Sequence, residues 1–249
     1  MKVVVCVKQV AVLGDEVEFT PDERDVDPEY IDHALNEWDA AATEEALQIR
    51  ERLGEGEVVA VSAGEGEAEP ALRRCLAMGA DRAVRVAGRF EDPFTVARAL
   101  AEAVRPEEPQ LVLCGVQSSD SVQAATGTAL AELLGLARAA VVTKVELADG
   151  RATVDRELEG GLVDIVDVDL PALLTIQTGI NQPRYANLRA IKQAEQQEIE
   201  VVEPGDLGTA AARVRRMFVP PKGEGAEMLG KDPAEVAGKI KQLIEEKMR

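Results

Sequence analysis

Aromatic residues are scarce in this chain of 249 residues, where Phe, Trp and Tyr together make up 3%. Because hydrophobic residues still account for 46% of the sequence, the core must be built mainly from Val, Leu, Ile and Ala. Aliphatic runs of this kind are typical of parallel strands buried on both faces. The length is sufficient to bury one complete α/β core.

Histidine and cysteine, which supply most nucleophilic and zinc-binding sites, are also rare. His33 is the only histidine, and the cysteines are Cys6, Cys75 and Cys114, with no C-x-x-C pair. A single histidine excludes a zinc site built from several histidines, and one isolated histidine does not by itself indicate a Ser-His-Asp triad. Three separated thiols offer no disulfide framework and suit a reducing cytoplasm. We therefore expect a cytoplasmic protein with no metal ion and no catalytic residues, which is not an enzyme in its own right.

Basic residues are outnumbered, with 28 Lys and Arg against 46 Asp and Glu and a formal charge of -18. An acidic surface repels DNA, RNA and anionic membranes, so we expect no nucleic-acid partner. Long apolar runs are absent as well, so we expect no direct membrane insertion. The chain passes from Met1 into an apolar strand, and this start does not resemble a signal peptide.

Short aliphatic runs alternate with helical patterns over the first half of the chain. We expect strands at 3–7, 58–61, 82–86 and 111–114, and helices at about 30–53, 69–78, 93–104 and 121–134. This alternation predicts an α/β fold with a doubly wound, mostly parallel, Rossmann-like sheet, whose ligands bind at the carboxyl ends of the strands. Apolar and polar residues then alternate at 141–145, 152–155 and 165–168, which predicts an antiparallel β addition. A run at 173–176 is expected to return to the main sheet.

Apolar residues become sparse after Gly179, and prolines and glycines are scattered through the segment that follows. Such a segment buries too little apolar surface to fold alone, so it is expected either to be disordered or to wrap a partner. Asp232 and Pro233 then open a final amphipathic helix as its cap and first residue. We expect an α/β nucleotide-binding domain over 1–190, and an extended C-terminal arm with the terminal helix over 191–249.

The loop after the fourth expected strand is the first candidate site. A strand, a small polar loop and a helix N-terminus together offer backbone N–H groups to a phosphate. In the loop from Gly115, the residues Ser118, Ser119 and Ser121 add hydroxyl groups without bulk. Alternatively, Ser119 or Asp120 simply caps the helix. The residues alone leave both interpretations open.

Two further features are ambiguous on the residues alone. Trp38, the only tryptophan, either fills the core or offers a flat ring on which a flavin or adenine stacks. Gly64 and Gly66 follow a strand and half-match a dinucleotide-binding fingerprint. The third glycine position of that fingerprint is Glu69, whose carboxylate disfavours a pyrophosphate.

Several blocks of the sequence match one known family. They are VCVKQV from Val5, NEWDAAATEEAL from Asn36, LRRCLAMGADRA from Leu72, VDRELEGGLVDIVDVDLPALLT from Val154, and NQPRY from Asn181. Along nearly its whole length the chain resembles the electron-transfer flavoprotein β subunit. The spacing of the last two blocks is the most specific part of this resemblance.

The resemblance implies a heterodimer with an α subunit, which the C-terminal arm embraces. The heterodimer would carry electrons from flavoprotein dehydrogenases, such as the acyl-CoA dehydrogenases of fatty-acid oxidation, to a membrane quinone oxidoreductase. Its FAD would lie mostly on the α subunit, and Leu13 and Trp38 match the flavin-facing residues of this subunit. Leu13 replaces a tyrosine that is often found there. The partner-recognition loop of the family corresponds to Asn187, Leu188 and Arg189.

The resemblance also implies a structural AMP within this chain. The matched pocket residues are Cys6, Asn36, Glu37, Trp38, Asp39, Ala63, Gly115, Val116, Gln117, Ser118, Ser119, Asp120, Ser121, Val122, Gln123, Ala124, Ala125 and Thr126. Their loop departs from the D-D-x-N-Q-T-G pattern of AMP-binding members and also lacks the G-D-T-A-Q-V-G pattern of bifurcating members, which hold a second FAD there. The alternatives are therefore a bifurcating subunit with FAD in place of AMP, and a stand-alone adenine-nucleotide-binding signalling module. The long C-terminal arm argues against the second.

Overall fold

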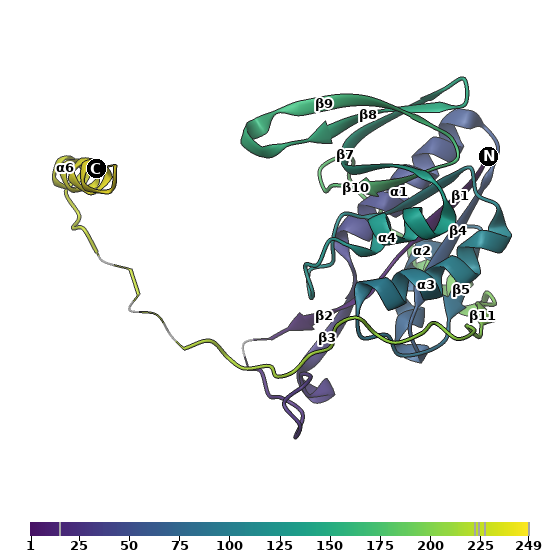
Figure 1. Cartoon of the computed structure of the whole chain (residues 1–249), viewed down its shortest axis with the longest axis horizontal. Helices are drawn as coiled ribbons and strands as arrows, with labels where there is room; N and C mark the ends of the chain where they lie inside the picture. The colour runs from purple at the N-terminus through teal and green to yellow at the C-terminus, as the bar shows by residue number, and fades with distance from the viewer. Residues whose placement is uncertain (15, 222, 224, 227, 249) are drawn as a thin grey trace. The chain divides into compact units, whose positions relative to one another are not determined.

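The computed structural model describes residues 1–14, 16–221, 223, 225–226 and 228–248, and Figure 1 shows the whole chain. The chain divides into two compact units, Met1–Arg216 and Met217–Arg249. Within the part of the chain that the structure describes, no helix combines the length and apolar composition needed to cross a membrane.

A nine-stranded sheet runs through the first unit. Its strands, in spatial order, are β11 (Glu200–Val202), β5 (Arg82–Val86), β4 (Glu57–Ala63), β1 (Lys2–Cys6), β6 (Leu111–Gly115), β10 (Ala172–Ile176), β7 (Ala137–Ala148), β8 (Arg151–Glu157) and β9 (Val163–Asp169). The pairs from β11 to β7 are parallel, whereas β7–β8 and β8–β9 are antiparallel. Strands β4 and β5 extend the sheet on one side of β1, and β6 continues it on the other. The doubly wound sheet with an antiparallel addition is therefore confirmed.

Helices cover both faces of the parallel strands (Figure 1). The α-helices of the chain are α1 (Glu37–Leu53), α2 (Glu69–Met78), α3 (Pro93–Val104), α4 (Thr126–Leu134), α5 (Leu188–Gln196) and α6 (Pro233–Lys247). Short 3-10 helices are η1 (Pro28–Tyr30), η2 (Gly66–Ala68), η3 (Arg105–Glu107) and η4 (Glu159–Gly161). Alternate residues of β1 point to opposite faces, so Val3 and Val5 pack with α1 and α2 while Val4 and Cys6 pack with α3 and α4.

The expected helix at 30–53 is wrong in its first part. Ile31–Leu35 forms strand β3, which pairs antiparallel with β2 (Gln9–Leu13) in a separate two-stranded sheet. Helix α1 begins only at Glu37, after the Asn36 N–H has bonded to the carbonyl of Lys8 at 3.0 Å. The apolar residues at 31, 34 and 35 fit a helical face, but this stretch forms a strand because its backbone groups pair with those of β2.

The first unit extends past the domain boundary expected after residue 190. Strand β11 joins the edge of the main sheet by pairing with β5, and Ala194 of α5 is 1% exposed. Further along, the Ala211 N–H donates to a carboxylate oxygen of Asp92 at 3.0 Å. Because these contacts tie the chain to the α/β core, the structure divides the chain after Arg216 instead.

The second unit contains the terminal helix that the sequence predicts. Asp232 caps α6 by accepting hydrogen bonds from the Ala234 and Glu235 N–H groups at 3.0 and 2.9 Å. Among the exposed side chains of α6 are Ile240, Leu243 and Ile244.

Candidate functional site

Most of the predicted nucleotide-site residues lie at one edge of the main sheet. Cys6 ends β1, Ala63 ends β4 and Gly115 ends β6, and β1 pairs in parallel with both β4 and β6. The carboxyl ends of these strands therefore meet where the strand order reverses. Ligands of open α/β sheets bind outside this edge.

Asp39 holds the ends of β1 and β6 from within helix α1. Its side chain is buried, and it accepts backbone hydrogen bonds from the Gly115 N–H at 2.7 Å and from the Lys8 N–H at 2.8 Å. The ladder between the two strands ends at Cys6 and Cys114. Beyond that point the carboxylate supplies the acceptors that buried amides require.

Asn36 fastens the loop that follows β6. Its side-chain amide donates to the Gln117 carbonyl at 2.8 Å, and its side-chain oxygen accepts from the Ser119 N–H at 3.3 Å. Asn36 is itself 1% exposed. The predicted groups at 36–39 and 115–121 are thus brought together through direct hydrogen bonds.

Lys8 is part of this site, although it is not among the residues predicted from the sequence. Its ammonium group lies 2.7 Å from an Asp120 carboxylate oxygen and 3.3 Å from the Ser118 hydroxyl, which in turn contacts the Ser121 hydroxyl at 2.8 Å. Its position in the sequence could have indicated this role, because a lysine that closely follows a buried first strand lies at the ligand-binding edge of the sheet.

Burial sets the protonation of the groups beneath the loop. Desolvation raises the pKa of Asp39 to about 6 from 3.8, against the opposing hydrogen bonds from Gly115, Lys8 and Asn36. Desolvation also raises the pKa of the Cys6 and Cys114 thiols, which therefore stay protonated. The site therefore holds a carboxylate with a pKa of about 6 beside two buried thiols that stay protonated.

Partial burial works to raise the pKa of Asp120, but the hydrogen bonds from Lys8 and Ser118 outweigh it and lower the pKa below its ordinary value. Asp120 therefore faces Lys8 as a carboxylate at neutral pH.

Two glycines allow close packing around the site. A Cβ atom at Gly115 would lie 2.5 Å from Trp38 Cβ and 2.6 Å from Asp39 Oδ1. A Cβ atom at Gly127 would lie 2.6 Å from Cys114 Sγ, as expected for a helix that approaches the sheet closely.

The expected start of helix α4 at Ser121 is wrong, because the helix begins at Thr126. Val122 and Ala124 have positive φ angles of 51° and 49°, which interrupt a helical path. The loop thus runs from Val116 through Ala125, and Ala125 occupies the N-cap position without a side chain that can accept the first N–H groups. Those N–H groups of α4 lack a side-chain cap.

The two residues predicted at the flavin edge lie on different elements, Trp38 on helix α1 and Leu13 on strand β2. Trp38 is partly buried at the start of α1, and its indole N–H donates to Gln177 Oε1 at 2.8 Å. Leu13 is 51% exposed at the far end of the β2–β3 ribbon, opposite Ile31. The four-residue offset between Leu13 and Gln9 carries it about 13 Å along the ribbon from the α1 end.

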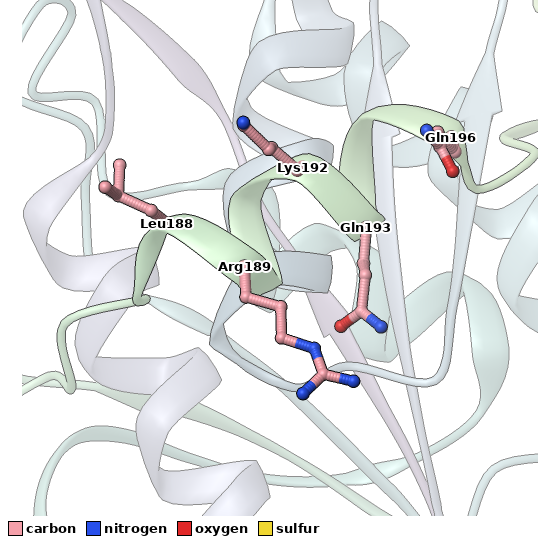
Figure 2. Close-up of a pocket in the computed structure, with 5 residues that line it drawn as sticks. All are labelled: Leu188, Arg189, Lys192, Gln193 and Gln196. Carbon is pink, nitrogen blue, oxygen red and sulfur yellow. The ribbon is translucent and has the colours of Figure 1, made fainter.

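The predicted recognition residues stand at the start of helix α5, outside the nucleotide site. Asn187 caps the helix by accepting from the Ala190 N–H at 2.9 Å, and Leu188 is 79% exposed. Figure 2 shows Leu188 and Lys192 directed to one side of α5 and Arg189 to the other. A shallow depression of about 410 Å³ borders these residues.

Across the described residues, no group of three or more His, Cys, Asp and Glu side chains is arranged to hold a metal ion.

Comparisons with known proteins give a consistent result. Residues 26–207 match a family model described as the electron transfer flavoprotein domain. The chain is 45% identical to electron transfer flavoprotein subunit beta of Methylophilus methylotrophus, over 99% of this chain and 98% of that protein. It is 36% identical to the Homo sapiens protein of the same name, over 84% of this chain and 83% of the human one.

A third relative, from Syntrophomonas wolfei, carries the same name and is 32% identical over 98% of this chain and 96% of its own length. The family model covers more than half of the chain, and these relatives match it nearly end to end or over its larger part. The chain belongs to the electron-transfer flavoprotein β-subunit family.

Proposed function

We propose that this chain forms a heterodimer with an α subunit and that the heterodimer transfers electrons from flavoprotein dehydrogenases, acyl-CoA dehydrogenases among them, to a membrane quinone oxidoreductase. The electrons travel on FAD held mainly by the α subunit. The observation that carries the proposal is the 45% identity to a β subunit. The aligned region covers 99% of this chain, so nearly every part of the chain has a counterpart in that protein. The chain contributes binding surfaces rather than reacting groups.

The nucleotide held within this chain is proposed to be AMP. The donor set suits one phosphate, since it combines the Lys8 ammonium, the Ser118 and Ser121 hydroxyls and the uncapped first turn of α4. Asp120 lies within the same cluster and already pairs with the Lys8 ammonium, so less positive charge is left for a second phosphate group. A group with a single phosphate therefore fits better than a pyrophosphate.

The flavin contact of this chain is proposed at Trp38 and Leu13. Trp38 offers part of its ring, because its indole N–H is already bonded to Gln177 and the side chain is only partly buried. The exposed Leu13 offers an apolar contact further along the ribbon. FAD supplies the redox chemistry when it is bound, and these side chains exclude water from its edge and fix its orientation.

The partner contact is proposed at Asn187, Leu188 and Arg189. An exposed leucine that enters a pocket on a partner protein behaves as a binding hot spot. The C-terminal unit from Met217 is proposed to pack against the α subunit, because its helix α6 carries the apolar side chains Ile240, Leu243 and Ile244.

The alternative function is a flavin-bifurcating subunit with FAD in place of AMP. One observation is on its side, that Ala124 and Ala125 stand in the loop where an AMP-binding pattern has Asn and Gln, but the loop also lacks the pattern of bifurcating members. A stand-alone adenine-nucleotide-binding module is a weaker alternative, because the chain carries the terminal unit and the exposed Leu188 in addition to the nucleotide site.

The experiment that tests the nucleotide proposal replaces Ser119 and Ser121 together by Glu in the heterodimer. Both new carboxylates would face the phosphate and crowd the N–H donors, so AMP should be absent from the acid-released extract while FAD is retained. The control places Glu at Thr153, a half-exposed position on β8, which is separated from β6 by β10 and β7. Retention of AMP by the Ser119 and Ser121 variant would show that the phosphate lies elsewhere.

A further inference from the structure

Arg184 ties the segment before helix α5 to helix α1. Its backbone N–H and Nε both donate to Glu44 Oε2, at 3.1 and 2.8 Å, and its Nη2 donates to Glu44 Oε1 at 3.0 Å. A third side-chain donor, Nη1, reaches Glu51 Oε1 at 2.7 Å. This two-pronged pairing fixes the guanidinium plane as well as its position.

The Glu44 carboxylate needs this arginine. Glu44 is 4% exposed, and burial alone would raise its pKa, but the hydrogen bonds from Arg184 and Gln48 lower it below the ordinary value. A buried carboxylate without its partner is strongly destabilising. The segment that carries Arg184 therefore cannot detach from α1 without leaving a buried charge uncompensated.

Two further contacts fix the same segment. Before Arg184, the Asn181 amide donates to the Ala41 carbonyl at 3.0 Å and to the buried Glu45 at 3.2 Å. At the far end of α5, Arg73 Nη1 of helix α2 donates to the carbonyls of Ala194 and Gln197 at 2.8 and 3.2 Å. Carbonyls at a helix C-terminus lack partners inside the helix, so Arg73 completes that end.

Between these fixed points two large side chains project outward. Tyr185 is 91% exposed and follows Arg184 directly, and Leu188 is 79% exposed at the first turn of α5. Their backbone is held by buried contacts while the side chains themselves contact solvent. Rigid presentation lowers the entropy cost of binding, because the segment does not have to be ordered when a partner arrives.

We propose that Arg184 is a positioning residue for partner docking, and that Tyr185 contacts the partner together with Leu188. The ion pair of Arg184 with Glu44 holds the backbone from Tyr185 to Leu188 in the conformation that an electron-donating flavoprotein dehydrogenase recognises. This inference rests on the proposed function, in which Leu188 is the partner contact, and it adds a second contact residue and the pair that presents both.

The test uses the assembled heterodimer with its FAD. The main variant, Glu44→Leu with Arg184→Met, removes both charges together and so avoids leaving one of them buried and unpaired. Arg184→Lys keeps the charge but loses the planar fork, and should give an intermediate effect. The control is Arg50→Met. Arg50 lies on α1, like Glu44, but its ion pair is with Asp81 and does not involve the segment that carries Arg184.

Two readouts separate docking from folding. Amide hydrogen exchange over 185–193 should become about tenfold faster in the double variant and stay unchanged in the control, because the segment loses its main tie. With a reduced acyl-CoA dehydrogenase as electron donor, KM for the heterodimer should rise about tenfold in the double variant and in Tyr185→Ala, while kcat and FAD content stay within about twofold.

Unchanged exchange over 185–193 in the double variant would overturn the positioning role. Faster exchange with an unchanged KM, or an unchanged KM in Tyr185→Ala, would overturn the docking role of the segment. An unchanged KM in Leu188→Ala would instead contradict the partner contact of the proposed function, so the two failures can be distinguished. If the native heterodimer accepts no electrons from the dehydrogenase, the proposed donor is wrong, and the exchange measurement still decides whether Arg184 orders the segment.

Discussion

The backbone N–H of Gly115 donates a 2.7 Å hydrogen bond to the buried carboxylate of Asp39, so helix α1 directly holds the end of strand β6. The same carboxylate accepts from the Lys8 N–H at 2.8 Å at the end of β1. One side chain therefore sets the spacing of the two strands from which the nucleotide site is built.

This arrangement predicts a pH dependence of stability. The pKa of Asp39 is about 6 in the folded chain, against 3.8 as its ordinary value, so between these pH values the folded state binds the proton more tightly than the unfolded state. The free energy of unfolding should fall as the pH rises through this window and level off above it. Asp39→Asn cannot titrate and should lose this component.

Urea unfolding of the heterodimer at about pH 4.5 and about pH 7 gives the change in the free energy of unfolding between the two pH values. This change should differ between wild type and Asp39→Asn by on the order of 2 kcal/mol. Asp22→Asn, at a fully exposed carboxylate, serves as the control. An equal stability difference between wild type and Asp39→Asn at both pH values would contradict the account.

A methyl group at position 115 should disturb the same point. Its Cβ would lie 2.5 Å from Trp38 Cβ, so either β6 or the start of α1 has to shift. We expect Gly115→Ala to lose about 1–3 kcal/mol of stability and most of the bound nucleotide. Gly66→Ala is the matched control, since a Cβ there meets nothing within 4 Å. Thermal melts and nucleotide analysis check the result, and equal behaviour of the two variants would show that the close approach is unimportant.

Lys8 should contribute to phosphate binding through its charge. Lys8→Met removes a cation beside the Ser118 hydroxyl, and the affinity for added AMP should fall roughly tenfold. Asp120→Asn should have the opposite effect, because it frees Lys8 from its 2.7 Å ion pair. Calorimetric titration of nucleotide-depleted protein with AMP measures both, and Lys144→Met, which removes a surface ion pair with Glu146, is the control. Tighter binding in Lys8→Met would rule out the phosphate contact.

The boundary after Arg216 predicts the pattern of limited proteolysis. The chain just before it is tied down, since Arg98 donates to the Thr209 carbonyl at 3.2 Å and Arg216 pairs with Glu23 at 2.7 Å. Trypsin should cut the isolated subunit at Lys231 about ten times faster than at Arg213, because cleavage requires local opening. Co-expression with the α subunit should protect Lys231. Faster cleavage at Arg213 would place the boundary earlier.

The existence of the first four parallel strands could be predicted because each is a short aliphatic run followed by a helical pattern, as in Val3–Val7 and Leu111–Cys114. The strand β3 could not, because Ile31, Ala34 and Leu35 fit a helical face equally well and only the pairing with β2 decides. Likewise β11 is too short and too exposed to be recognised without its neighbour β5.

Part of the candidate site could also be predicted from the sequence. The loop from Gly115 follows from its place between a strand and a helix, but the anchoring role of Asp39 does not. In a chain with 46 acidic residues, a carboxylate that is buried between two strand ends cannot be distinguished by sequence from the many that are solvated. The late start of α4 depends on the positive φ angles of Val122 and Ala124, which their side chains do not favour.

The most direct test of the central proposal is the cofactor content of the heterodimer, purified with its α subunit and denatured in acid. The account predicts one FAD and one AMP for each heterodimer, with the AMP lost in the Ser119 and Ser121 to Glu variant. Recovery of two FAD and no AMP would contradict it and would instead support the bifurcating alternative.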